Sequence, residues 1–261
     1  MSWTHLGTQF CLTLAFGLLL GLSCIPKVPL GPFFFRMMGT TAMIPLAGAI
    51  LGPPLVGDSS WSSPVVVASA LAVLAFPVIQ APVKARTRAL ALYWSTICCG
   101  AAIVFAVQEA PLVAGPGAIA LAALSTMATG GVAGGVGLAM VVGHWYLTVP
   151  QLPVSWLQRL NRYTIVAMLA SLLFLGLSVW LHAPALEDSR TPLLGPYGLF
   201  YLGGRISVGM ALPLLFAWMA AGSLRYQNTR SATGILYAST VVVLIGAAAS
   251  LSLQDTYGVP L

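Results

Sequence analysis

Four side chains in this sequence combine a polar or ionisable group with an apolar segment long enough to cross a membrane. They are His144, Tyr146, His182 and Arg205. An imidazole donates a hydrogen bond to a quinone carbonyl or ligates haem iron through a ring nitrogen. A guanidinium offers a planar fork of N–H donors to a carboxylate, a phosphate or a haem propionate. Because burying ionisable groups in a membrane is costly, these residues are candidates for cofactor binding.

Each candidate also has a structural interpretation. His144 and Tyr146 belong to the sequence Gly-His-Trp-Tyr at the end of an apolar segment. They suit either a quinone or haem site or an aromatic belt at the membrane interface. Arg205 lies about two turns inside its segment, where a guanidinium binds an anion, extends to the interface or hydrogen-bonds to a partner helix. His182 ends the preceding apolar segment, near the same face as Arg205.

Apolar segments of about 20 residues must position these side chains. The chain of 261 residues is 59% hydrophobic and 6% charged, whereas a soluble domain carries about 25% charged residues. We therefore predict one all-α membrane domain over residues 1–261, a polytopic integral membrane helix bundle of about eight transmembrane helices. The predicted spans cover residues 4–24, 37–57, 63–82, 89–108, 118–147, 163–183, 197–221 and 232–253.

The loop charges predict the orientation of the bundle. All five acidic residues lie in one set of loops and the C-terminal tail, and nine of the eleven basic residues lie in the alternating set. Short loops rich in Lys and Arg remain in the cytoplasm. Both termini are therefore expected on the periplasmic or exterior side of a cell (inner) membrane. The basic residues form no stripe, which argues against a nucleic-acid partner.

This orientation limits the chemistry of the histidines. It places His144 and His182 at opposite faces, so they cannot share one haem iron. His5 and His182 lie on the same face and would form a haem pair only if the first and sixth spans are neighbours. No Asp or Glu lies inside a predicted span, which disfavours a carrier driven by proton or sodium coupling.

Two further patterns concern helix packing. The segment 118–147 is long for one span, and tilt, a break or a non-spanning first turn would each absorb the excess. It contains the pairs Gly130/Gly134 and Gly131/Gly135, whose spacing allows neighbouring helices to approach closely. Prolines inside spans, such as Pro77 and Pro213, predict kinks.

Short similarities are compatible with a parallel 4+4 repeat whose halves are residues 1–112 and 113–261. Arg88 and Arg230, for example, each follow a threonine at the start of a span and precede a Tyr-x-Ser-Thr sequence. Four spans per half preserve the orientation, so an axis along the membrane normal would relate the halves. In architecture alone, two four-helix units resemble quinone-reactive anchor subunits of respiratory complexes.

Three functions fit these observations. The first is a membrane subunit of a respiratory or photosynthetic electron-transfer complex that binds quinone, haem b or pigment. The second is a transporter or channel for a small anionic or neutral solute, with Arg205 as the anion contact. The third is a structural subunit that packs against other membrane-protein subunits in the lipid bilayer. No nucleotide-binding or hydrolytic motif occurs, so we do not expect the chain to be catalytic on its own.

Overall fold

The computed structural model describes residues 3–109, 113–149 and 151–261, and these form helices joined by short loops. Helix bounds are α1 Trp3–Cys24, α2 Gly31–Leu55, α3 Pro64–Val73, α4 Phe76–Gln80, α5 Ala85–Val107, α6 Pro116–Thr148, α7 Ser155–Leu181, α8 Ala183–Glu187, α9 Pro196–Ile206, α10 Leu212–Arg225 and α11 Thr229–Tyr257. A π-helical turn, η1 (Ser207–Ala211), joins α9 to α10. The prediction of an all-α polytopic bundle is confirmed.

Seven of the eight predicted spans are helices long and apolar enough to cross a membrane. The third predicted span, 63–82, differs: it is the shorter apolar stretch Pro64–Gln80, divided into α3 and α4. Pro77 explains the division. It has no N–H to donate to the carbonyl of Val73, the last residue of α3, and its ring crowds that carbonyl.

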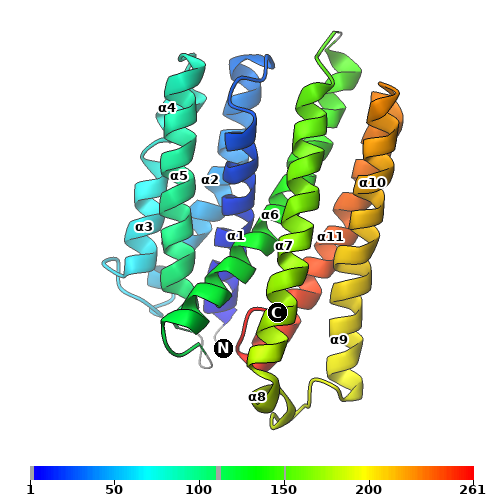
Figure 1. The fold of residues 1–261 in the computed structure, drawn as a ribbon. Helices are drawn as coiled ribbons and strands as arrows, with labels where there is room; N and C mark the ends of the chain where they lie inside the picture. Colours follow the sequence, from blue (N-terminus) through cyan, green and yellow to red (C-terminus); the bar gives the residue numbers. More distant parts are fainter. Residues whose placement is uncertain (1–2, 110–112, 150) are drawn as a thin grey trace.

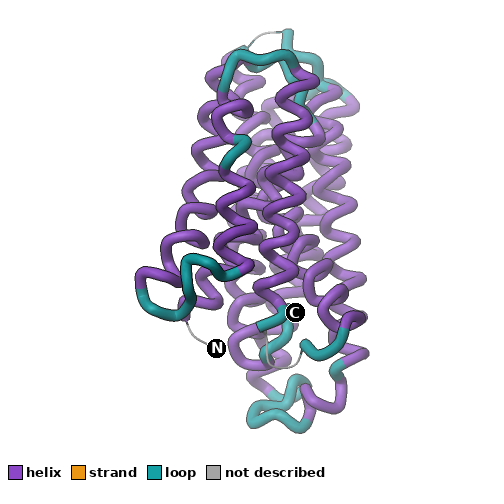
Figure 2. Tube along the Cα trace, turned by 90° about the vertical axis from the view of Figure 1, so that its left-hand side faces the viewer, coloured by secondary structure: helices purple, strands orange, loops and turns teal. Residues whose placement is uncertain are grey.

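Consecutive spans, with α3–α4 and α9–α10 each counted as one span, run in opposite directions along the bundle, and both described chain ends lie at one end of it (Figure 1). The loops after α1, α4, α6 and α10 lie at the other end, as the view in Figure 2 also shows. Nine basic residues lie in or beside these loops, and we call this the basic end. All five acidic residues lie at the opposite, acidic end.

The helices pack as two groups of four. In residues 3–109, α1 packs on α2 and α5, and α3 joins α2 to α5. In residues 113–261, α6 packs on α7 and α11, and α10 joins α7 to α11. An extensive contact between α1 and α6 connects the groups. This arrangement agrees with a 4+4 division, while the internal repeat itself stays a prediction.

Glycines make the contact between the groups possible. A methyl group added at Gly17 of α1 would lie 1.7 Å from the carbonyl oxygen of Gly130 on α6. One added at Gly134 would lie 2.3 Å from the backbone of Gly17. Gly135 instead faces α7, where a methyl group would meet the ring of Tyr163 at 2.5 Å. The predicted packing role of these small residues is confirmed, and the two pairs serve two different neighbours.

The long helix α6 accommodates its length by tilt. It runs unbroken for 33 residues, which corresponds to about 50 Å. Figure 1 shows it crossing the bundle obliquely behind α7. Of the three ways to absorb the excess length, the structure uses tilt.

Like Pro77, Pro213 in the α9–η1–α10 span interrupts helical hydrogen bonding. Pro213 cannot donate to the carbonyl of Gly209 four residues earlier, and the π-helical turn Ser207–Ala211 lies there. Beside this turn, Gly209 contacts Gly246 of α11 so closely that a methyl group added at Gly246 would lie 2.2 Å from the Gly209 Cα. The span therefore bends without separating into two helices.

The outer faces of the bundle are apolar. Ile97, Trp180, Phe200 and Trp218 are each at least 71% exposed. A soluble protein rarely exposes so many large apolar side chains, whereas a bilayer solvates them. With the seven long apolar helices, this pattern makes the chain a multi-pass membrane protein.

Candidate functional site

An apolar groove of about 630 Å³ lies between α1, α2 and α6. Leu14 and Leu18 of α1, Ile44 of α2 and Val141 of α6 are among its lining residues. Its lining is almost entirely hydrocarbon and sulfur, apart from Thr41. Such a surface suits the chain of a lipid-soluble molecule.

The groove continues toward the basic end into a second hollow of about 440 Å³. The two hollows share Met38, Thr41, Met140 and Val141. The second adds polar groups: it is lined by His144 and Tyr237, and the Tyr237 hydroxyl lies 3.2 Å from His144 Nδ1. The combined groove thus has a long apolar part and a polar end.

Tyr146 does not share this hollow. Its hydroxyl donates a hydrogen bond to the carbonyl oxygen of Pro153, in the loop between α6 and α7. That bond ties the end of α6 to the loop that follows it. The position of Tyr146 therefore matches the structural interpretation, and the partner of His144 is Tyr237, on a helix 93 residues away.

His182 lies at the end of α7, where its Nδ1 faces the Ser178 carbonyl oxygen at 3.0 Å. Arg205 lies inside the second group of helices. The hydrogen bonds of the described residues therefore join neither His144 to Tyr146 nor Arg205 to His182.

Arg205 is the most deeply buried charge of the described residues, with 2% of its surface exposed. Its Nη2 donates to the hydroxyls of Thr129 at 2.7 Å and Ser171 at 3.3 Å, and its Nη1 faces the Gly246 carbonyl oxygen at 3.5 Å. Its Nε is buried without a partner among the described residues. The guanidinium does not extend to the interface, and only neutral oxygens solvate it.

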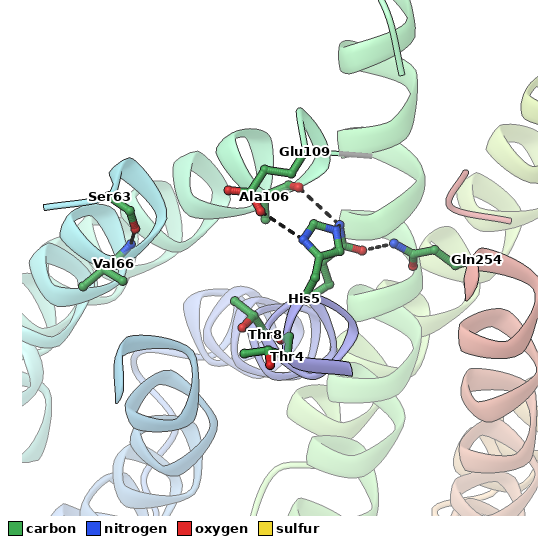
Figure 3. Close-up of polar contacts among 9 residues, drawn as sticks. Thr4, His5, Thr8, Ser63, Val66, Ala106, Glu109 and Gln254 are labelled. Carbon is green, nitrogen blue, oxygen red and sulfur yellow. Dashed lines mark hydrogen bonds and ion pairs between the residues drawn. The ribbon is translucent and has the colours of Figure 1, made fainter. Parts of the chain in front are cut away.

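A chain of hydrogen bonds at the acidic end was not predicted. His5 Nδ1 lies 3.0 Å from Glu109 Oε2, and its Nε2 lies 2.9 Å from the side-chain nitrogen of Gln9. The Gln254 amide donates to the Gln9 oxygen. Figure 3 shows His5 with Glu109 and Gln254 approaching from two other helices. Both nitrogens of His5 thus have protein partners, which leaves none to form a haem pair with His182.

A small cavity of about 30 Å³, with several polar side chains in its lining, adjoins this chain between α1, α6 and α11. Its lining includes Gln9, Gln254 and Thr129, the residue that also binds Arg205. This volume is enough for a water molecule or two. Polar groups therefore extend from the acidic end to the buried guanidinium.

One signal for the unpredicted residues is present in the sequence. Gln9 is an amide inside the first predicted span and Gln254 directly follows the last one, and both are almost fully buried, at 2% and 5% exposure. A buried amide needs hydrogen-bond partners, so such residues mark the places where spans make polar contacts. Which partners they find depends on the packing of the helices.

The chain matches no known family model, no curated protein and no solved structure. Its function is therefore inferred from these sites.

Proposed function

We propose that this protein is an integral membrane subunit of a respiratory or photosynthetic electron-transfer complex, and that it binds a long-tailed quinone in the groove between α1, α2 and α6. The observation that supports this proposal is the His144–Tyr237 pair at the polar end of an otherwise apolar groove. A quinone has the same division, with a polar ring and a hydrocarbon tail.

The hydrogen bond between Tyr237 and His144 is compatible with binding of a quinone carbonyl. When the Tyr237 hydroxyl donates to Nδ1, the proton of the neutral imidazole resides on Nε2. The Nε2–H is then a donor, as a quinone carbonyl requires, while metal ligation would need the unprotonated nitrogen. The flexible side chains of Met38 and Met140 adapt to a ring or a tail.

Gentle purification from native membranes, followed by quinone extraction and an optical spectrum, tests the proposal. We expect extractable quinone, and saturable binding of a short-tailed quinone analogue to the purified protein. His144→Ala should weaken binding about tenfold, the equivalent of one good hydrogen bond, and Tyr237→Phe should weaken it less. His182→Ala is the matched control because it changes a histidine at the other end. Absence of quinone, haem and pigment together with unsaturable binding would refute the proposal.

The charge distribution supports a proposed orientation and location. We place the protein in the cell (inner) membrane with its basic end in the cytoplasm and both termini on the periplasmic or exterior side. Reporter enzymes fused after Asp58 and after Arg225 should be active on opposite sides. Reporters active on the same side would contradict this orientation. A stable complex recovered during purification would identify the other membrane subunits that the electron-transfer function requires.

A second candidate function is the passage of a small anionic or neutral solute. The buried Arg205 supports it, because the described residues provide no carboxylate for its guanidinium and leave its Nε without a partner. Flux of such solutes into liposomes should then fall in Arg205→Ala. Unchanged flux in that variant would count against the second candidate.

A further inference from the structure

A pocket of about 210 Å³ opens at the acidic end. It lies between the start of α1, the loop after α2, the start of α3 and the end of α5. Two carboxylates line it, Asp58 and Glu109, with His5 and the hydroxyl of Ser59. No lysine or arginine lines it, so its charge is negative.

Two groups in the pocket have unused hydrogen-bonding capacity. The Ser59 Oγ is shielded from solvent and has no hydrogen-bond partner among the described residues. The carboxylate of Asp58 forms no ion pair with any residue in the described ranges. Polar atoms that are buried in a pocket without partners commonly await a ligand or water.

The hydrogen-bond chain behind the pocket holds Glu109 in place. Gln9 donates to the Ala106 carbonyl oxygen at 3.3 Å, and since only the amide nitrogen can donate, this contact fixes which way the amide points. The same nitrogen therefore donates to His5 Nε2, and the Gln9 oxygen accepts from Gln254. His5 then carries its proton on Nδ1 and donates it to Glu109.

This arrangement orients the carboxylate of Glu109. A neutral imidazole that donates one hydrogen bond positions the carboxylate without cancelling its charge, unlike a lysine or arginine in the same place. One carboxylate oxygen of Glu109 remains available to the pocket, because His5 contacts the other. The buried amides of Gln9 and Gln254 thus act as positioning residues for an anionic pocket wall.

Size and geometry indicate an organic cation. The hollow is many times larger than a single ion, and no cluster of three metal-ligating side chains occurs among the described residues. Carboxylate and hydroxyl oxygens distributed around such a space match a ligand with several N–H donors. We propose that this pocket binds a small organic cation with an ammonium or guanidinium group, held by Asp58, Glu109 and Ser59.

Calorimetric titration of the purified full chain in detergent tests the proposal, with ethylammonium and methylguanidinium as probes at constant ionic strength. We expect saturable binding at one site. Tetramethylammonium has the same charge and no N–H, and should bind at least about tenfold more weakly. Equal binding of tetramethylammonium, or no saturable binding of any probe, would overturn the proposal.

Three variants locate the site. Glu109→Gln and Asp58→Asn should each weaken binding about tenfold; both residues are exposed, so the fold should survive. Asp188→Asn removes an acid of the same end outside the pocket and should leave binding unchanged. Equal weakening in all three variants would show a general charge effect and refute the site. Gln254→Leu should weaken binding less than Glu109→Gln, because it releases Gln9 without removing charge.

Discussion

The two groups of four helices accommodate a proline inside a span in different ways. In each group the third span contains a proline in its interior. In the first group Pro77 divides the span into α3 and α4, and in the second group a π-helical turn precedes Pro213 and the helix continues. Arg205 lies in the last turn of α9, directly before that π-helical turn, and its side chain is buried in the second group. The divided span of the first group contains no charged side chain.

The two spans differ in energetic cost, because only the second one buries a charged side chain, Arg205. The helix break at Pro77 buries no charge that needs polar side chains from other helices. A buried guanidinium needs oxygens on several helices, and α6, α7 and α11 supply them to Arg205. π-helical turns occur frequently at functional sites, so we expect the third span of the second group to serve a function that the third span of the first group lacks.

The joint between the groups should give the largest effect. Gly17→Ala places a methyl group 1.7 Å from the Gly130 carbonyl oxygen, and backbone on both sides cannot yield as a side chain would. We expect a loss of about 3 kcal/mol or more in the free energy of unfolding, measured by thermal unfolding in detergent. Gly7→Ala is the control on the same helix, because nothing lies within 4 Å of its added methyl group. Equal stability of both variants would contradict a tight joint.

Removal of the Arg205 charge should change the free energy of unfolding by an intermediate amount, and should raise it where Gly17→Ala lowers it. In Arg205→Met the hydroxyls of Thr129 and Ser171, 3.4 Å apart, can still bond each other. Removing a buried charge without a carboxylate partner should therefore raise the free energy of unfolding by about 1–2 kcal/mol. Urea or thermal unfolding measures it. A loss of stability would mean that the guanidinium serves the fold, and would remove the functional contrast between the groups.

Replacement of Pro77 in the first group should have the smallest effect on the free energy of unfolding. Pro77→Ala restores a donor for the Val73 carbonyl, yet it also frees the unfolded chain, so the free energy of unfolding should change by less than about 1 kcal/mol. The sensitive measurement is hydrogen exchange, in which amides of α4 should become more protected as α3 and α4 join. Unchanged exchange would show that the division has another cause than the proline.

The spans and their alternation were readable from the sequence because apolar length and loop charge are local properties. Most helix ends lie within four residues of the predicted bounds, but α2 begins six residues and α7 eight residues earlier than predicted, and Pro77 divides the third span. That division depends on a single missing donor. The glycine pairs of α6 were also recognisable as packing residues. Which helix each pair faces was not, because residues one position apart point to different neighbours.

The polar contacts were the least predictable part. His144 was identified as a candidate, but its partner Tyr237 is 93 residues away, and Gln9 meets Gln254 across 245 residues. Such pairs depend on how helices rotate and tilt within the bundle, which no short sequence pattern encodes. Tyr146 was paired with His144 by proximity in sequence, whereas side chains two positions apart on a helix point in different directions.

The helix α6 takes part in nearly every feature described above. It carries Gly130 against α1, Gly135 against α7, Thr129 on the guanidinium and His144 at the groove. Backbone contact holds this helix against α1, and the ring of Tyr163 lies against it on α7. The groove at His144 and the buried guanidinium of Arg205 thus share one unbroken helix as a wall.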